Sequence, residues 1–529
     1  MPMRVLIADP IAPDGAEILG ARGVDADTRI GLKEDELIAA IGDYDGLIVR
    51  SETKVTPGVL TAAKKLQVVG RAGVGYDNID VEAATGHGVI VVNAPSSNTI
   101  SAAEHTLAMM LSVARHVPQA HSSLAGGEWN RRKFLGTELR GKTLGIVGLG
   151  RIGSEVARRA AAFEMRILGY DPFVAEEHGR HLGAEIVSLP ALFERSDIIT
   201  LHTPMTDSTR RLIGEPELSQ MKKGAILINC ARGGLVDEDA LRNAIEEDRI
   251  GGAALDVFIT EPPEDSPLFQ HPNVVVTPHL GASTEEAQSN VAREVAEQMV
   301  DVFEGRAPRY AVNAPLIPPE TAAELAPYVP LALVVGRLAS QLTEGQPERL
   351  SISFRGAVGE LATDILAATV LSGFLQTGTE TRINIVNAGT EAQRRGIHVQ
   401  QSKDADQTPP YTNLVNVDVH TTAGETTVGA TLTERGQTEI VQVNGYQVGI
   451  IPTGGHWMII GHTDRPGMLG RIGTVTGENN INIASLHVSR ESMRGPALTV
   501  VNVDESPKEQ HIAAILGIDG VDTVRVVNL

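Results

Sequence analysis

The sequence contains very little cysteine and few aromatic residues. Among 529 residues, Cys230 is the one cysteine, and aromatic residues make up 3%. A single cysteine cannot form an intramolecular disulfide, and it excludes a zinc site built from several cysteines. No run of 18 apolar residues occurs, so we predict no membrane-spanning segment. The first residues, MPMRVLIADP, lead directly into a predicted strand without a signal-peptide core, so we expect a cytoplasmic protein.

Positive charge is also scarce. Lys and Arg number 45 against 66 Asp and Glu, which gives a net charge of −21. This charge repels nucleic acid and anionic membranes, so we expect neither as a partner. A phosphorylated substrate would therefore need a local cluster of Arg or Lys. The length predicts about three to four domains.

Short apolar runs alternate with helical segments through the first 280 or so residues, which is typical of parallel sheets covered on both faces. The first series comprises RVLIADP (4–10), GLIVRS (46–51), QVVGRAG (67–73) and VIVVNAP (89–95). A second series runs from KTLGIVGLG (142–150) to NVVVTPH (273–279). We predict an α/β fold with two doubly wound parallel sheets. We predict that residues 1–97 and 285–316 form a flavodoxin-like domain and that the inserted residues 98–284 form a Rossmann domain, with ligands in the cleft between them.

The remainder of the chain has a different pattern. The proline-rich segment AVNAPLIPPE (311–320) is interpreted as a linker. Residues 317–453 mix helical and strand signals, so we predict an α+β intervening domain without a catalytic constellation. Residues 454–529 follow the order βαββαβ, which predicts a ferredoxin-like unit. Its lack of acid–base groups favours binding or regulation over chemistry.

A glycine-rich turn follows the predicted strand TLGIV and precedes a predicted helix. In this turn, Gly148 would allow a tight bend, Gly150 would let a pyrophosphate approach, and Gly153 would let the helix pack against the strand. Asp171 ends the next strand, where a carboxylate accepts hydrogen bonds from a ribose and opposes a 2′-phosphate. The motif therefore predicts NAD rather than NADP. The alternative is a strand–turn–helix that binds no ligand.

Three residues with catalytic potential follow the later strands. Arg232 lies in NCARGG, Glu261 in DVFITEPP and His279 in VTPHLGAS. Because these segments follow parallel strands, we expect the side chains to meet in the cleft. An Arg can hold a carboxylate and polarise a C2 oxygen, a His can take the hydroxyl proton, and a Glu can fix the tautomer of that His. The trio predicts hydride transfer on a 2-hydroxy acid, with no metal.

The series GLGRIG, YDP, HTP, NCARGG, DVF, EPP and TPHLGAST resembles the D-isomer-specific 2-hydroxyacid dehydrogenase family. With its carboxyl-terminal extension, the chain is similar over essentially its whole length to the long branch of that family, which oxidises D-3-phosphoglycerate. The resemblance implies that Arg232 anchors the substrate carboxylate, that His279 is the proton donor or acceptor and that Glu261 is its partner. It also implies NAD contacts, with Asp256 at the nicotinamide carboxamide. Beyond the glycine motif, these contacts are Arg151, Ile152, Asp171, Thr203, Cys230, Ala231, Arg232, Asp256, His279, Leu280, Gly281 and Ala282.

Substrate contacts are implied in the same way for Gly73, Val74 and Asn98. Arg50 and Arg71 lie at the ends of early strands and are predicted to reach the phosphate, and Ser51 is predicted as a further substrate contact. In the family, basic residues from the region of Arg131, Arg132 and Lys133 cross a subunit interface to a neighbour's substrate, so we expect a dimer or tetramer. The alternative for this cluster is a solvated basic turn.

The carboxyl-terminal unit resembles the ACT module, which implies L-serine as an effector held by His462, Asp464 and Asn482. The alternative is a purely structural dimerisation unit. The expected reaction is NAD-dependent oxidation of D-3-phosphoglycerate to 3-phosphohydroxypyruvate, the first step of L-serine biosynthesis, with 2-oxoglutarate/2-hydroxyglutarate as a further substrate pair. Two alternatives stay open: a different D-2-hydroxyacid dehydrogenase, such as a glyoxylate/hydroxypyruvate reductase, and a non-catalytic NAD-sensing interaction protein.

Overall fold

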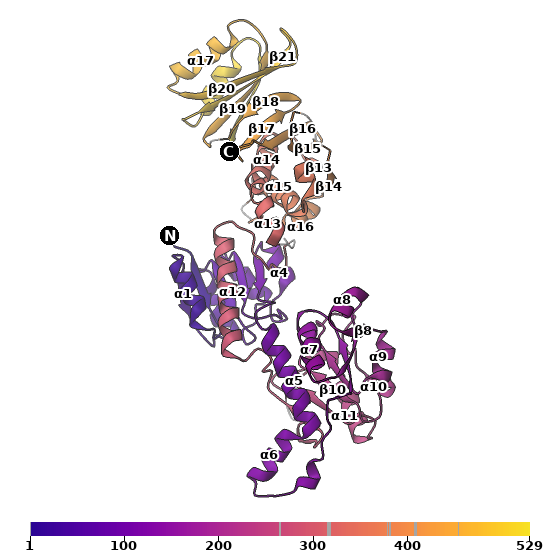
Figure 1. The fold of residues 1–529 in the computed structure, drawn as a ribbon. Helices are drawn as coiled ribbons and strands as arrows, with labels where there is room; N and C mark the ends of the chain where they lie inside the picture. The colour runs from indigo at the N-terminus through magenta and orange to yellow at the C-terminus, as the bar shows by residue number, and fades with distance from the viewer. Residues whose placement is uncertain are drawn as a thin grey trace.

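The strands form four sheets along an elongated molecule, in which the first unit lies between the second and the third (Figure 1). This arrangement holds for the part of the chain described by the computed structural model, namely residues 2–263, 266–314, 319–377, 379, 382–406, 410–452 and 454–529. Two sheets are parallel, one is mixed and one is antiparallel. The predicted fold class is confirmed.

The first sheet is parallel, with the strand order β2-β1-β3-β4-β5 of flavodoxin-like folds. Its strands are β1 (Arg4–Ile7), β2 (Asp25–Thr28), β3 (Gly46–Val49), β4 (Val68–Arg71) and β5 (Ile90–Asn93). One face packs against α1 (Pro13–Ala21) and α12 (Glu285–Phe303). The other packs against α2 (Glu34–Ile41), α3 (Pro57–Ala62) and α4 (Val81–Gly86). Apolar runs such as GLIV are buried on both faces, which explains why they do not alternate with polar residues.

The second sheet is also parallel, with the order β12-β11-β10-β9-β6-β7-β8. Its strands are β6 (Thr143–Val147), β7 (Arg166–Tyr170), β8 (Ala184–Ile186), β9 (Ile198–Leu201), β10 (Ile226–Asn229), β11 (Gly252–Leu255) and β12 (Val274–Val276). One face packs against α5 (Thr99–Arg115) and α7 (Arg151–Ala162). The other packs against α9 (Leu189–Arg195), α10 (Glu215–Gln220) and α11 (Glu238–Glu246). The short α8 (Glu176–His181) precedes β8. The chain enters this unit through α5 and returns to the first sheet through α12.

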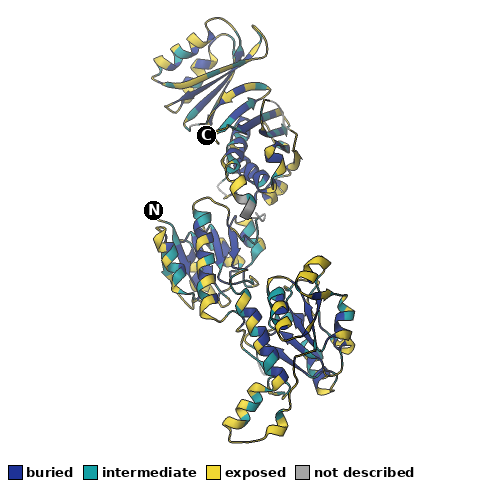
Figure 2. Ribbon diagram, in the orientation of Figure 1, coloured by how far each residue is buried: buried dark blue, intermediate teal, exposed yellow. Residues whose placement is uncertain are grey.

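An arm extends from the second unit beyond α5 (Figure 1). It contains α6 (Val117–Ala125) and a 3-10 helix at Arg131–Phe134, neither of which buries a side chain. Trp129 is 77% exposed and Leu135 is 87% exposed. The arm therefore exposes several apolar side chains, and Figure 2 colours most of it as exposed.

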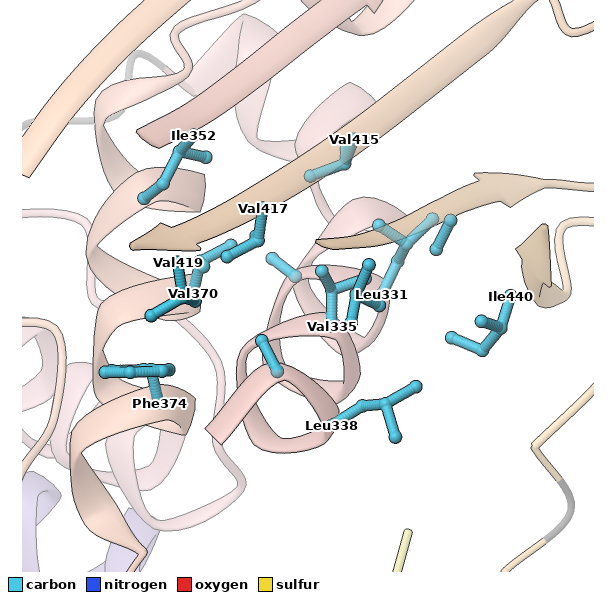
Figure 3. Close-up of a cluster of buried hydrophobic side chains, with 14 of the residues drawn as sticks. Leu331, Val335, Leu338, Ile352, Val370, Phe374, Val415, Val417, Val419 and Ile440 are labelled. Carbon is cyan, nitrogen blue, oxygen red and sulfur yellow. The ribbon is translucent and has the colours of Figure 1, made fainter. Parts of the chain in front are cut away.

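The third sheet is mixed, with the order β14-β13-β15-β16-β17-β18. Its strands are β13 (Pro347–Gly356), β14 (His398–Asp404), β15 (Asn413–Thr421), β16 (Gly424–Leu432), β17 (Thr438–Val443) and β18 (Tyr446–Ile450). The helices are α13 (Pro319–Leu325), α14 (Tyr328–Leu342), α15 (Asp364–Gln376) and α16 (Ala388–Arg394). Figure 3 shows the core, where Leu331 and Val335 of α14 and Phe374 of α15 lie under Val417 and Val419 of β15.

The fourth sheet is antiparallel, with the order β20-β21-β19-β22. Its elements are β19 (His456–Thr463), α17 (Met468–Glu478), β20 (Ile483–Arg490), β21 (Pro496–Val503), α18 (Glu509–Leu516) and β22 (Val521–Asn528), in the predicted order βαββαβ. Met458 and Ile460 of β19 face the two helices. Trp457 and Ile459 alternate with them and belong to the core of the third unit. The last unit is therefore covered on both faces.

Part of the predicted linker belongs to the first sheet instead. Ala311 bridges Val92, the amide of Val312 donates to the carbonyl of Val91, and Asn313 accepts a hydrogen bond from the amide of Val91. The correction has a simple cause, since β5 is an edge strand with unpaired backbone groups that this segment satisfies. Residues 315–318 of the predicted linker lie outside the described residues.

Candidate active site

The glycine-rich turn lies between β6 and α7. Gly148 has φ 95°, and a Cβ there would lie 2.6 Å from the carbonyl oxygen of His202. A Cβ on Gly153 would lie 2.0 Å from the carbonyl oxygen of Gly148. In contrast, a Cβ on Gly150 would meet no atom within 4 Å. Two of the glycines therefore serve the turn itself, whereas the space beside Gly150 is open to a ligand.

Asp171 lies beside this turn, immediately after β7. Its carboxylate accepts hydrogen bonds from the amide of Leu149 at 2.9 Å and from the amide of Phe173 at 2.9 Å. The acidic group is thereby fixed next to the first turn of the sheet, where dinucleotide-binding folds hold a ribose.

A cavity of about 350 Å³ continues from the start of α7 towards the ends of β9, β10 and β12. Among the residues predicted for the cofactor, those on its wall are Arg151, Ile152, Thr203, Cys230, Ala231, Arg232, His279, Gly281 and Ala282. The Oγ1 atom of Thr203 and the Oδ1 atom of Asn98 are buried without a hydrogen-bond partner among the described residues. These polar atoms and the open space at Gly150 fit a dinucleotide. The sequence interpretation missed His202 and Pro204 on this wall, because neither belongs to a motif with a stated mechanism.

Asp256 and Leu280 do not line this cavity. The Asp256 side chain is fully buried, and its carboxylate accepts hydrogen bonds from the amides of Leu280 and Gly281. In this structure the Asp256 carboxylate binds the loop that carries His279, and its contact with the nicotinamide carboxamide stays a prediction.

Cys230 ends β10 on the cavity wall. Burial raises the pKa of its thiol well above the ordinary range, and the negative charge of Asp256 raises it further. The thiol is therefore protonated at neutral pH and is a poor nucleophile. Its contribution is apolar surface.

The three predicted catalytic residues meet at the edge formed by the carboxyl ends of β10, β11 and β12. His279 Nδ1 lies 2.7 Å from Glu261 Oε2, and the amide of Phe258 donates to Glu261 Oε1 at 3.1 Å. Arg232 lines one cavity with Glu261 and His279. Its Nη1 donates to the carbonyl of Ala231, and its Nε lies 3.4 Å from Asp77 Oδ2. The geometry leaves Nε2 of His279 as the nitrogen available to a substrate.

The charge state of Glu261 follows from its surroundings. Burial by itself raises the pKa of this carboxyl, but the hydrogen bond and charge of His279, the amide of Phe258 and the charge of Arg232 together hold the pKa below its usual range. Glu261 is therefore ionised at neutral pH. An ionised Glu261 accepts the Nδ1 proton of His279 and fixes the tautomer of the ring.

A second cavity, of about 460 Å³, adjoins the first. Five residues line both cavities: Val74, Asn98, Arg232, His279 and Ala282. Arg232 and His279 therefore lie on the boundary between the two cavities. The other predicted substrate residues on the wall of this second cavity are Arg50, Ser51, Arg71 and Gly73. The sequence interpretation missed Asp77 and Arg210, which also line it. Asp77 lies three residues after the predicted substrate residue Val74, in the segment GRAGVGYDN (70–78), whereas Arg210 carries no sequence signal.

Arg71 is the most perturbed cation of this cavity. Burial lowers its pKa to about 10, and the charges of Arg232 and Arg50 contribute to the decrease. Its Nε atom is buried without a hydrogen-bond partner among the described residues. A Cβ on Gly75 would lie 2.1 Å from Arg232 Nη2, so a larger residue there would displace the guanidinium. Three cations that repel one another around a cavity form a site for an anion of more than one charge.

Comparison with known proteins agrees with this geometry. The family pattern described as "D-isomer specific 2-hydroxyacid dehydrogenase, NAD binding domain" matches residues 107–281. The pattern "D-3-phosphoglycerate dehydrogenase intervening domain" matches residues 324–444, and "ACT domain" matches residues 456–520. The D-3-phosphoglycerate dehydrogenase of Methanocaldococcus jannaschii is 44% identical over 529 residues, covering 100% of both chains. That of Bacillus subtilis is 41% identical and covers 99% of both. The chain belongs to the D-3-phosphoglycerate dehydrogenase family.

Solved structures match a little over half of the chain. A Thermus thermophilus protein is 37% identical with a TM-score of 0.55 and covers 59% of this chain and 100% of its own. The D-lactate dehydrogenase of Aquifex aeolicus, solved with NAD and lactic acid, is 28% identical with a TM-score of 0.52 and covers 59% of this chain and 99% of its own. As a member of this family, the chain is an oxidoreductase with NAD as its cofactor.

Arg131 and Arg132 are not brought to the substrate cavity of their own chain. Both lie in the 3-10 helix of the exposed arm. Lys133 lines a different groove, formed with α6 and residues 269–276. A role for the two arginines towards substrate would therefore require a second copy of the chain.

The predicted effector residues separate into two groups. His462 is 3% exposed, and its ring nitrogens contact the hydroxyl of Thr499 at 2.7 Å and the carbonyl of Thr463 at 3.0 Å. Its ring is buried in the sheet in this structure, and its role as an effector ligand stays a prediction. Asp464 and Asn482 lie nearer the surface, where Asp464 Oδ2 accepts from Arg490 at 2.8 Å and Asn482 Nδ2 donates to Asp504 at 2.6 Å.

Among the described residues, no group of three or more His, Cys, Asp or Glu side chains could hold a metal ion. In the same part of the chain, no helix combines the length and apolarity needed to span a bilayer.

Proposed function

We propose that this chain oxidises D-3-phosphoglycerate to 3-phosphohydroxypyruvate with NAD, the first step of L-serine biosynthesis. The observation that carries the proposal is the position of His279 and Arg232 on the boundary between the cavity at the start of α7 and a second cavity, which Arg50 and Arg71 also line. Arg232 and His279 suit the carboxylate and the hydroxyl of a 2-hydroxy acid, and Arg50 and Arg71 suit its phosphate.

The residues of the chain have distinct roles in this reaction. Arg232 binds the substrate carboxylate and stabilises charge on the C2 oxygen. His279 Nε2 accepts the C2 hydroxyl proton, and ionised Glu261 stabilises the imidazolium that results. When bound, NAD supplies the acceptor for the hydride that leaves C2. In the reverse direction, the imidazolium returns the proton to the C2 oxygen.

The phosphate would lie near Arg50 and Arg71. The amides around Gly73 and Val74 support the carboxylate end, since both residues line the same cavity. We propose that the chain forms a homodimer or tetramer through the exposed arm, with Arg131 and Arg132 directed to a neighbour's substrate. The apolar surface at Trp129 and Leu135 supports this assembly. The low cysteine content fits a cytoplasmic location.

We propose that L-serine regulates the enzyme through the ACT unit, with Asp464 binding the ammonium and Asn482 the carboxylate. Both contacts made by Asp464 use Oδ2, so Oδ1 is the oxygen proposed for the effector. Serine is expected to lower activity or raise the melting temperature. No change in either property would leave the unit a structural dimerisation element.

The test of the reaction is a steady-state assay with NAD and four D-acids: 3-phosphoglycerate, glycerate, lactate and 2-hydroxyglutarate. We expect kcat/KM for 3-phosphoglycerate to exceed the values for glycerate and lactate by about 100-fold or more, because a charge-assisted phosphate contact contributes about 1.5–3 kcal/mol and two are available. Turnover of 2-hydroxyglutarate would add the second predicted substrate pair. Comparable rates on the unphosphorylated acids would instead indicate a broader dehydrogenase, such as a glyoxylate/hydroxypyruvate reductase.

A further inference from the structure

The loop that carries His279 is held by a buried carboxylate. Asp256 is 0% exposed. Its Oδ1 accepts hydrogen bonds from the hydroxyl of Thr277 at 2.6 Å and the amide of Leu280 at 2.7 Å, and its Oδ2 accepts from the amide of Gly281 at 2.9 Å. These donors stand on both sides of His279 in the sequence. The carboxylate therefore fixes the backbone on either side of the catalytic ring.

The backbone of His279 needs such support. Its φ is 56°, in the left-handed region that residues with a Cβ seldom occupy. Its amide donates to the carbonyl of Asp256 at 2.8 Å and to that of Thr277 at 3.0 Å. An unfavourable conformation of this kind persists only where surrounding contacts determine it. Asp256 supplies most of those contacts.

One further side chain reaches Asp256, and it comes from a distant element. His105 lies in α5, with its Nε2 atom 3.1 Å from Asp256 Oδ1 and 3.2 Å from Thr277 Oγ1. Its side chain is 18% exposed and lines neither the cofactor cavity nor the substrate cavity. Burial by itself raises the pKa of Asp256, but the hydrogen bonds from His105, Thr277 and Leu280 hold the pKa below its usual range. Asp256 is thus kept as the anion that accepts the loop amides.

We propose that His105 is a positioning residue for the reaction, acting on His279 through Asp256 and Thr277. The inference rests on the proposed function. The α5 helix is also where the chain passes from the first sheet to the second, and Asn98 at its start lines both cavities. Through His105, this connecting helix and the proton-transfer loop share one hydrogen-bonded network.

The test compares His105→Ala with His105→Gln, since the glutamine amide can replace the Nε2–H donor. We expect His105→Ala to lower kcat by about 10-fold or more, with KM for NAD and substrate changed less than about threefold. His105→Gln should retain kcat within about threefold. Met110→Leu, further along α5 and buried, is the control for helix packing and should keep the rate. A lower kcat in this variant would show that a change in helix packing alone reduces the rate.

A double-mutant cycle with His279→Ala separates positioning from a merely structural effect. If His105 acts through His279, adding His105→Ala to His279→Ala should change the residual rate less than about twofold. An equal loss in both backgrounds, or an undiminished rate in His105→Ala, would overturn the proposal. A wild-type enzyme inactive on D-3-phosphoglycerate would refute the proposed function instead. An active wild type with unimpaired His105→Ala refutes the positioning role alone.

Discussion

At the scale of single residues, the substrate cavity is defined by a cluster of cations in an acidic protein. Arg50, Arg71 and Arg232 line one cavity in a chain of net charge −21. Their mutual repulsion contributes to the lowered pKa of Arg71, so they are held together at a cost. A bound phosphate and carboxylate would remove that repulsion. The cluster is therefore best explained by its ligand.

Arg71→Met tests this explanation. The substitution keeps much of the side-chain volume but removes a charge-assisted contact that contributes about 1.5–3 kcal/mol, so KM for D-3-phosphoglycerate should rise about 10- to 100-fold. Because D-glycerate has no phosphate, its KM should change little. Steady-state kinetics on both acids provides the measurement and its control. Equal changes in the two KM values would contradict a phosphate role for Arg71.

The sequence predicts these residues unequally. Arg232, Glu261 and His279 could be recognised because each follows a strand of one parallel sheet, and their meeting is a consequence of that topology. Arg210 could not, since it follows β9 in a loop whose path the sequence does not determine. Strand alternation decides which face a residue occupies, and His462 points into the sheet, which its sequence pattern alone did not predict.

At the scale of elements, the glycine turn has two roles: Gly153 allows close packing within the turn, and Gly150 leaves space for a ligand. A methyl group on Gly153 would meet the carbonyl of Gly148 at 2.0 Å, whereas one on Gly150 would meet no atom within 4 Å. Gly153→Ala should therefore lower the stability of the ligand-free protein by about 1–3 kcal/mol. Gly150→Ala should melt like the wild type without NAD but show a smaller NAD-induced rise in melting temperature. A full NAD-induced rise in Gly150→Ala would show that the cofactor does not approach this turn.

The α16 helix provides a pH-dependent prediction. Glu391 accepts hydrogen bonds from Arg394 and Arg395 at 2.7 Å, and the pKa of its carboxyl is lowered to about 2, chiefly by the bond from Arg394. Because the folded-state pKa lies below the unfolded value of about 4.3, this stabilisation is complete above that pH and is lost as the pH falls towards 2. Both guanidinium groups are partly in water, so we expect Glu391→Gln to cost only about 1 kcal/mol at pH 7.

Urea denaturation of the wild type and Glu391→Gln at pH 7 and pH 3 measures this difference. The difference should shrink at the lower pH, and Glu434→Gln, at an exposed position, should show none at either. A difference that is independent of pH would exclude ionisation of Glu391 as its source.

Element prediction fails where tertiary pairing decides the structure. The edge strand β2 has the sequence DADT and no buried residue, so no apolar run predicts a strand there. It forms because its backbone pairs with β1, from Arg4 opposite Asp25 to Ile7 opposite Thr28. Ala311–Asn313 was assigned to a linker for the same reason. The buried strands β3 and β10, in contrast, were evident from their apolar sequences.

At the scale of the whole molecule, the last two units share one core. Trp457 and Ile459 of β19, Val500 of β21 and Val527 of β22 belong to the same buried cluster as Leu338 of α14. Gln341 exchanges two hydrogen bonds with the backbone of Asn528. Asn384 and Arg382 in turn donate to the carbonyls of Gly88 and Leu66 beneath the first sheet. A change in the ACT unit can therefore reach the substrate domain through packed structure.

Trp457→Ala should destabilise both carboxyl-terminal units together. Trp457 is 3% exposed, and its truncation is expected to cost about 3–5 kcal/mol. Limited proteolysis should then release fragments from residues 319–452 as well as from 454–529. Ile460→Ala, on the opposite face of the same strand and 0% exposed, should open the ACT unit alone. Cleavage confined to the ACT unit in both variants would argue against a shared core.

The central claim is that His279 transfers the proton at the boundary of the two cavities, and His279→Ala measures it most directly. Formation of NADH from D-3-phosphoglycerate should fall by about 10²–10⁴ in kcat, because general acid–base catalysis contributes about that factor. NAD affinity and melting temperature should stay close to the wild-type values. A loss of less than about tenfold, with the fold and NAD binding intact, would contradict the assignment of His279 to the chemistry.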